Sequence, residues 1–594
     1  MTPIPPENHG RTSLQGSGAL GLARIAIGLV QGALLYGLWL SASGEPMAWP
    51  ATQPTLFAAL GLAIGFAPMV LLAGVGRLSV RSLVIWAMIA TAALAMLGWH
   101  DAAVQTREPN YPPYLRFPVV AFSAAALFIA HHLVVPAVTS RRWIANFDDY
   151  FDTAWKAGVQ LALSLGFTLA FWVLFFLGAA PFDVIGLSFL PDLIDKEWFT
   201  IPVTCLVFAV AVQLTDVRDG LIRGVRTVAL MLLSWLLLVM TVLVAGFLLA
   251  LPFTGLDGLW NTGSATALVL GAAAALIILI NTAYQDGRDD NQPPLLLRGA
   301  VRVASLLLVP LVAIAIWGLA LRIGQHGLTP DRIIASACTL VGVVHALGYS
   351  YGALSPLWRS LSWMKPLERT NVAAAVLTVG LILALFSPLL DPARLSVADQ
   401  VSRLERGRVP VAEFDFQFLR FDSGRFGQVA LARLARFNDP TIAQRAREIQ
   451  QMSVRSSDVP TGQTLPVFQT WPAGQAVPEG FATRTHPGDP RFNCNAKAGC
   501  VLVLRDLDGD GQLEALMADR YTLNLYRAEG TTWSYAGLYP LASCGQRERD
   551  PRDLLKSPDL DFAPARVPDL RLGARRFSFS PDMSCRPDAV LTPQ

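Results

Sequence analysis

Eleven apolar stretches recur along the first 390 residues, and each is long enough to cross a lipid bilayer. A hydrocarbon core of roughly 30 Å requires about 20 residues at helical rise. The chain of 594 residues is 53% hydrophobic and only 15% charged, which argues against a water-soluble globule. The expected spans are residues 19–40, 55–75, 83–99, 117–138, 157–180, 198–214, 227–251, 264–284, 300–321, 333–351 and 372–390.

The Lys and Arg side chains indicate how these spans are threaded, because cytoplasmic connections retain cations. An N-terminus in the cytoplasm places most of them on the inner side: Arg11, Arg77, Arg81, Arg141, Arg142, Lys156, Arg218, Arg223, Arg226, Arg288, Arg298, Arg359, Lys365 and Arg369. The opposite connections hold only Arg107, Arg116, Lys196, Arg322 and Arg332. An odd number of spans then places the C-terminal region outside the cytoplasm. An alternative for the first span is a cleaved signal peptide, with Ser41 to Ser43 as the small-residue site.

We therefore expect an all-α polytopic protein of a bacterial inner membrane, followed by a small β-rich soluble domain in the periplasm. The predicted divisions are a disordered cytoplasmic tail (1–18), a transmembrane helical domain (19–390), a mostly helical connector (391–459), a linker (460–490) and a β-rich domain (491–594). The net charge of +3 gives no field that would favour nucleic acid. The expected partners are the lipid bilayer and a periplasmic protein.

Three stretches of the connector have a recognisable pattern. Apolar residues recur at helical spacing over 396–408, a Pro-initiated helix is predicted over 441–452, and alternating phenylalanines predict a strand over 414–421. The connector must pack on the membrane surface or on the C-terminal domain, and we favour the domain. Within that domain, strands are predicted over 501–504, 513–517, 522–527, 532–538 and 576–580.

Four of the six cysteines lie in the C-terminal region, and the other two, Cys205 and Cys338, lie in expected spans. Disulfides persist in oxidising compartments, so these four predict two bridges. Three pairings are open. We favour Cys494 with Cys500 and Cys544 with Cys585.

An acidic stretch in the same domain resembles a calcium-binding loop. Asp506, Asp508 and Asp510 alternate with other residues, and Glu514 follows. Carboxylates at this spacing supply the hard oxygen ligands that calcium prefers. Position 12 of the loop is Met517, so an EF-hand is excluded, and the flanks read as strands. The alternative is an acidic hairpin turn whose aspartates are solvated.

Ionisable residues inside a membrane are costly and often functional. None of the spans as drawn contains Asp or Glu, which argues against a carboxylate proton relay. Arg24 sits near a span end, where snorkelling explains it. His131, His132 and His345 are the remaining candidates for a polar intramembrane site, and interhelical hydrogen bonding is the alternative. Adjacent histidines point to different helix faces, which disfavours a metal site.

Three stretches resemble a bacterial integral-membrane family catalogued as domain of unknown function 4153. They are Ala154-Trp155-Lys156 running into residues 159–172, then Trp198-Phe199-Thr200-Ile201-Pro202-Val203-Thr204, and the region from Asp391-Pro392 through Phe414-Asp415-Phe416 and Leu419-Arg420-Phe421 to Gly424-Arg425-Phe426-Gly427. The resemblance covers roughly residues 15–435 and implies a fold and an envelope location, without an activity. The acidic, cysteine-containing region lies beyond it.

Standard catalytic signatures are missing from the sequence: it has no phosphate-binding Gly-rich loop, nucleophile elbow or His-Glu-x-x-His motif. We therefore expect a non-enzymatic envelope protein that displays or senses through its outer domain. A permease or flippase that uses the intramembrane polar residues is the first alternative. A membrane-embedded transferase acting on a lipid-linked substrate, with Asp183 and Asp192 as acids, is the second.

Overall fold

The computed structural model describes the chain in two compact units, residues 1–450 and 451–594. The residues described are 13–44, 46–106, 114–185, 187, 189–217, 219–255, 264–288, 292–357, 363–452, 468–482, 491, 494, 499–507, 509–519, 522–530, 532–539, 550–556, 570–572 and 575–577.

Among the described residues of the first unit, eleven helices are long and apolar enough to cross a membrane. They are α1 (Ser13–Ser43), α2 (Pro54–Gly74), α3 (Val80–Val104), α4 (Phe117–Thr139), α5 (Phe147–Val184), α7 (Glu197–Val217), α8 (Asp219–Thr254), α10 (Ala265–Tyr284), α11 (Leu295–His326), α12 (Pro330–Leu354) and α13 (Pro366–Leu385). Each coincides with one predicted span, so the helical prediction is confirmed. Helices are expected because lipid cannot hydrogen-bond to an exposed backbone.

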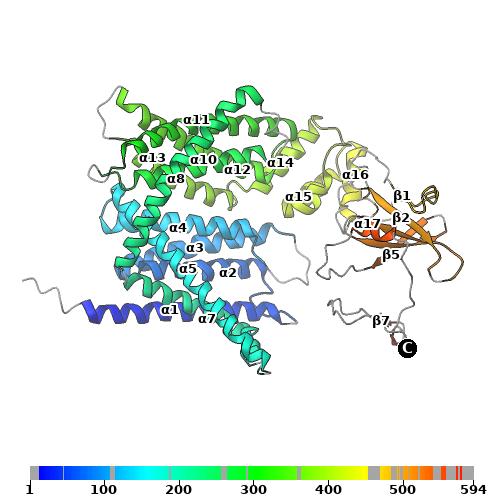
Figure 1. Cartoon of the computed structure of the whole chain (residues 1–594), viewed down its shortest axis with the longest axis horizontal. Coiled ribbons are helices and arrows are strands. Elements are labelled where there is room, and N and C mark those ends of the chain that lie inside the picture. Colours follow the sequence, from blue (N-terminus) through cyan, green and yellow to red (C-terminus); the bar gives the residue numbers. More distant parts are fainter. Residues whose placement is uncertain are drawn as a thin grey trace, which may run out of the picture. The chain divides into compact units, whose positions relative to one another are not determined.

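The spanning helices form two neighbouring groups (Figure 1). One group comprises α1 to α5 and α7, and the other comprises α8 and α10 to α13. Residues of α2, α3, α4, α12 and α13 share a buried cluster that joins the groups. The short helix α6 (Phe189–Ile194) lies between α5 and α7.

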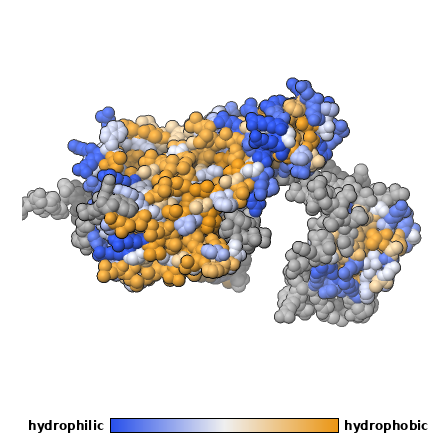
Figure 2. Space-filling view, turned by 90° about the horizontal axis from the view of Figure 1, so that it is seen from above, coloured by the Kyte–Doolittle hydropathy of each residue, from blue (hydrophilic) through white to orange (hydrophobic). Residues whose placement is uncertain are grey.

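Large apolar side chains cover the outside of this unit. On α8, Leu237 is fully buried whereas Leu232 is 58% exposed and Val242 is 70% exposed. On the face drawn in Figure 2, hydrophobic residues cover the side of the helical unit, and hydrophilic residues gather towards its ends. Such a surface is stable only against hydrocarbon. The chain is therefore a multi-pass membrane protein, as predicted.

Two glycines let α1 and α7 approach closely. A Cβ at Gly28 would lie 2.6 Å from Cβ of Ala209, and one at Gly32 would lie 2.5 Å from Cα of Pro202. The spacing Gly28-x-x-x-Gly32 is a small-residue motif typical of packed membrane helices. Our sequence reasoning did not use it.

The connector packs on the ends of membrane helices. It contains α14 (Pro392–Glu405), α15 (Gly424–Leu434) and α16 (Pro440–Gln451). The last carbonyl groups of an α-helix have no partners within it. Here the side chains of α14 donate hydrogen bonds to those of α11 and its turn: Arg403 to Gly324 and Gln325, Gln400 to His326 and Leu328, and Ser396 to Leu328. The connector is therefore part of the membrane unit, and its expected packing on the C-terminal domain stays a prediction.

The predicted strand over 414–421 is wrong. The chain turns at Phe414 and forms a short π-helix, η3 (Phe418–Asp422). Oδ1 of Asp415 accepts a hydrogen bond from the backbone N–H of Phe418, at 2.9 Å. Such local side-chain bonds compete with a sheet ladder. The buried rings of Phe414 and Phe416 pack edge to face, 4.7 Å apart between centroids.

The second unit contains a five-stranded sheet in the order β1 (Phe468–Thr470), β2 (Cys500–Arg505), β3 (Glu514–Ala518), β4 (Leu523–Glu529) and β5 (Thr532–Tyr539). Strands β2 to β5 pair antiparallel, and β1 pairs parallel to β2. A short helix, α17 (Pro551–Leu555), contacts β2 and β3, and β6 (Leu570–Leu572) pairs with β7 (Arg575–Phe577). The β-rich prediction is confirmed, although β1 falls in the range expected to be linker.

Candidate binding cavity among the membrane helices

A cavity of about 430 Å³ lies between α2, α4, α5 and α7. Its walls are mostly apolar, with polar groups only from His131, His132 and Gln160. Leu161 and Leu165 of α5 also line it, and they are 39% and 54% exposed on the outside of the unit. The volume lies within the range of roughly 300–1,000 Å³ typical of small-molecule sites. The cavity therefore borders the bilayer along α5 and has a polar region at the histidines.

His131 presents a hydrogen-bond donor at Nε2. Its Nδ1 lies 3.1 Å from Nε1 of Trp86 on α3. An indole N–H can only donate, so Nδ1 is the acceptor. The neutral ring then carries its proton on Nε2, where the described residues provide no partner.

His132 has the opposite tautomer. Its Nδ1 lies 2.6 Å from the backbone oxygen of Phe128, which can only accept, so Nδ1 carries the proton. Nε2 of the neutral ring is then an acceptor, and it is buried without a hydrogen-bond partner in the described structure. The side chain is 8% exposed.

The two rings lie close together, with centroids 5.3 Å apart. Neighbours on a helix leave it in different directions, but both histidines are among the residues that line the cavity. It is thus bordered by one donor and one acceptor on adjacent residues. Sequence reasoning found both histidines, whereas it could not find the pocket or the tautomers.

A charged cluster lies beside Gln160. Arg24 of α1 donates to Asp216 at 2.7 Å and to Gln213 at 2.5 Å, and Arg77 donates to Asp216 and Gln160 at 3.3 Å each. Nε2 of Gln160 donates to the carbonyl of Val212 at 3.1 Å. Arg24 is only 2% exposed, so the snorkelling explanation is wrong. The sequence analysis did not find its partner, Asp216, because α7 continues beyond the expected end of its span at residue 214.

His345 belongs to a different part of the unit. It lies on α12, its Nδ1 is bound to the carbonyl of Val341 at 2.9 Å, and its ring packs on Tyr349. Tyr349 joins Asn281 and Asn371 in a closed ring of three hydrogen bonds of 2.5–2.7 Å. The predicted polar site is therefore divided: His131 and His132 share the cavity, whereas His345 adjoins an interhelical network.

A second groove, of about 720 Å³, lies between the end of α3 and the connector helices α14 and α15. Its lining includes His100, and the rim is basic through Arg394, Arg425 and Arg433. Nε2 of His100 lies 2.7 Å from Oδ2 of Asp391, and both side chains are buried. Arg433 is paired with Glu405. Sequence reasoning missed the pair because His100 lies beyond the expected end of its span at residue 99.

The acidic loop of the second unit joins β2 to β3. The carboxylate of Asp506 accepts the N–H groups of Gly509 and Gly511, at 2.7 and 3.0 Å, and Glu514 accepts that of Leu507 at 2.8 Å. Asp510 similarly accepts the N–H of Gln512 at 2.7 Å. Asp508 lies outside the described residues, among which no group of three acidic, His or Cys side chains fits a metal ion. Calcium binding stays a prediction.

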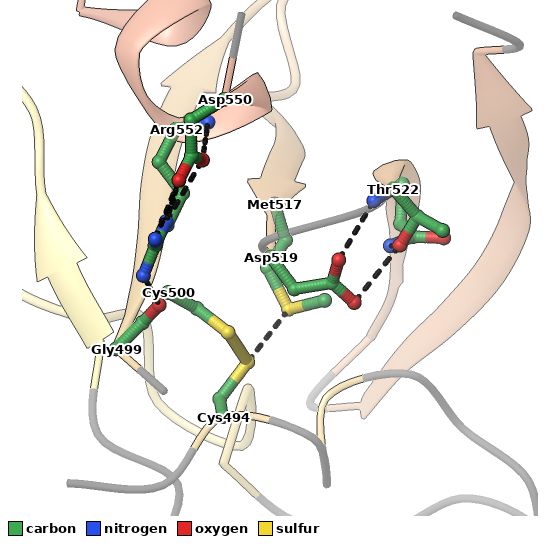
Figure 3. Close-up of a disulfide and its surroundings, with 9 residues drawn as sticks. Cys494, Gly499, Cys500, Met517, Asp519, Thr522, Asp550 and Arg552 are labelled. Carbon is green, nitrogen blue, oxygen red and sulfur yellow. Dashed lines mark hydrogen bonds and ion pairs between the residues drawn. A yellow bond between two sulfur atoms is a disulfide. The ribbon is translucent and has the colours of Figure 1, made fainter. Parts of the chain in front are cut away.

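The predicted bridge between Cys494 and Cys500 is present (Figure 3). It packs against strand β3, where Sγ of Cys494 contacts Sδ of Met517 at 3.4 Å. Both cysteines belong to a buried cluster with Phe481, Tyr526 and Trp533. Cys544 and Cys585 lie outside the described residues, so their pairing stays a prediction. Of the two acids named for a transferase, Asp192 lies on α6, and the side chain of Asp183 is not described.

These features define a class: a multi-pass membrane protein whose helical unit carries a connector on its helix ends, and whose chain continues into a β-rich unit. The chain belongs to the family described as domain of unknown function (DUF4153), whose model matches residues 56–436. No curated protein and no solved structure matches the chain. The family resemblance inferred from the sequence is therefore confirmed, and the β-rich unit lies beyond the matched region.

Proposed function

We propose that this protein is a non-enzymatic sensing or display protein of a bacterial inner membrane, with its N-terminus in the cytoplasm and its β-rich unit in the periplasm. The attachment of the connector carries the proposal. α14 is bonded to the open carbonyl end of α11 and to α3 through the pair of His100 and Asp391. A change in the packing of the membrane helices would therefore reach the connector directly.

The polar groups of the membrane unit favour this function over transport. The ring of Asn281, Tyr349 and Asn371 is closed, and the charge of Asp216 is matched by Arg24 and Arg77. Satisfied networks of this kind hold helices together. The cavity at His131 and His132 is mainly apolar, unlike the hydrated passage that a polar substrate needs.

The proposed orientation has two independent supports. The cation-rich connections alternate along the chain, as the positive-inside rule requires. The disulfide of Cys494 and Cys500 lies in the unit placed outside, where an oxidising compartment preserves it.

Reporter fusions test the orientation. Alkaline phosphatase joined after Gln594 should be active, and green fluorescent protein at the same position should be dark. The converse result would contradict the proposed orientation.

Removing the β-rich unit tests the proposed sensing or display function. A strain that produces only residues 1–452 should show the same fitness profile across envelope stresses as a strain without the gene, because sensing or display needs the outer unit. Membrane levels of the truncated protein must match wild type. Full complementation by the truncated protein would contradict the proposed function and favour a permease.

A further inference from the structure

We propose that the cavity between α2, α4, α5 and α7 binds the hydrocarbon chain of a lipid, and that His131 and His132 together bind a hydroxyl or carboxylic acid group at its polar end. The inference goes beyond the proposed function, because the ligand is assigned whether or not its binding is signalled to the outer unit.

The apolar walls of the cavity favour a hydrocarbon chain as the ligand. Phe66, Met69, Leu127 and Phe208 surround a space bordered by the small residues Gly65 and Ala124. Apolar cavities do not hold water and accept apolar molecules instead. Leu161 and Leu165 connect the space to the outer surface of α5, where lipid chains are the surrounding solvent. A lipid can therefore enter sideways from the bilayer without crossing a polar barrier.

The two histidines determine which polar group the ligand carries at its end. Nε2 of His132 is a buried acceptor to which none of the described residues donates a hydrogen bond, which is costly in a protein interior. The neighbouring residue, His131, offers a proton at its own Nε2, and the centroids of the two rings lie 5.3 Å apart. One O–H group satisfies both, because it donates to His132 and its oxygen accepts from His131.

Both polar atoms of Gln160 already have partners within the protein. Its Oε1 accepts from Arg77, and its Nε2 donates to the carbonyl of Val212. A phosphodiester or an ester offers acceptors only and would leave Nε2 of His132 unpaired. The site should therefore prefer a fatty acid, a long-chain alcohol or a monoacylglycerol over lipids without a free O–H.

Photocrosslinking of the full-length protein in phosphatidylcholine nanodiscs tests the proposal. The probe is a 16-carbon fatty acid with a diazirine in its chain, and crosslinks are mapped by mass spectrometry. They should concentrate on α2, α4 and α5. Unlabelled palmitic acid or hexadecanol should compete about tenfold better than methyl palmitate, as expected for loss of a hydrogen bond to a buried acceptor. The better competitor of the two shows whether the site prefers the O–H group of a carboxylic acid or that of an alcohol.

Two kinds of variant separate the chain from the polar end. Ala124→Phe fills the cavity and should abolish the localised crosslinks, whereas Leu232→Phe, on the exposed face of α8, should leave them unchanged. His132→Phe should remove the preference for the acid over the ester while retaining the chain. Crosslinks spread evenly over all exposed helices, or equal competition by ester and acid on the wild-type protein, would overturn the proposal.

Discussion

Nε2 of His100, at the end of α3, lies 2.7 Å from Oδ2 of Asp391, the residue that caps α14. The other oxygen of the same carboxylate accepts the backbone N–H of Arg394 at 2.9 Å. One side chain therefore ties a membrane helix to the first turn of the connector. This contact explains why the connector belongs to the membrane unit.

The pair predicts an acid-sensitive connector. Burial disfavours the charged carboxylate, but the hydrogen bonds from His100 and Arg394 outweigh it, so the pKa of Asp391 lies below its ordinary value. A carboxyl whose pKa falls on folding stabilises the folded state fully above its unfolded pKa of about 4, and this contribution is lost as pH falls through the lower folded value.

Asp391→Asn should therefore lower the protection of α14 amides at pH 7 and flatten its dependence on pH below about 4. Hydrogen exchange of the protein in nanodiscs measures both effects. Glu413→Gln, at an exposed position of the connector, is the matched comparison for loss of one carboxylate. Identical acid profiles for wild type and Asp391→Asn would refute the role of this pair.

Close packing of α1 on α7 predicts a position-specific response on a single helix. Valine at Gly28 or Gly32 would collide with Ala209 or Pro202, whereas Gly37 of the same helix faces open space. We expect Gly32→Val to lower the midpoint of thermal unfolding in detergent and Gly37→Val to leave it unchanged or raise it, since glycine is a weak helix former. Equal effects at the two positions would show that the α1–α7 contact is absent.

The cluster of Arg24, Arg77 and Asp216 predicts strong coupling. Asp216→Asn leaves two arginines without their carboxylate, one of them buried, and should cost about 3 kcal/mol of stability. Adding Arg24→Met should recover part of this loss, because the buried charge is removed as well. Chemical unfolding of the single and double variants gives the coupling energy, and purely additive effects would contradict the buried pair.

Arg491 supports the core of the β-rich unit. It is fully buried, with its guanidinium carbon 5.2 Å from the ring centroid of Phe481 and 4.8 Å from that of Tyr526. It donates to the carbonyls of Phe481 and Trp533, at 2.7 and 3.2 Å. Lysine retains the charge but lacks the planar fork. Arg491→Lys should therefore speed proteolysis of residues 468–556 at least tenfold, whereas Arg505→Lys, at the exposed end of β2, should not.

Calcium binding at Asp506, Asp508, Asp510 and Glu514 predicts that added calcium slows proteolysis of the same unit and that a chelator reverses the effect. Asp508→Asn should weaken the response. Because the described carboxylates already bind backbone N–H groups, the alternative is a loop that closes without metal. Cleavage rates that calcium and chelator leave unchanged would reject the calcium site.

The sequence predicted the spans well because lipid restricts the backbone to helices, so apolar length alone locates them. It also predicted four strands of the sheet from alternation and turn residues. The sequence-based predictions failed where a contact between distant residues or a local side-chain bond determines the structure. Asp415 accepts a backbone hydrogen bond in the phenylalanine-rich segment, and Asp216 is the partner of the buried Arg24. β1 consists of only three residues, which pair with β2. The histidines were found by their cost in a membrane, but their hydrogen bonds depend on Trp86 and Phe128, whose positions no local pattern encodes.

The most direct test of the lipid-binding cavity is a cryo-electron microscopy map of the full-length protein in nanodiscs that contain palmitic acid. Our account predicts elongated density between α2, α4, α5 and α7 that ends about 3 Å from Nε2 of both His131 and His132. A collapsed or water-filled cavity, with Nε2 of His132 bonded to another protein group, would contradict it.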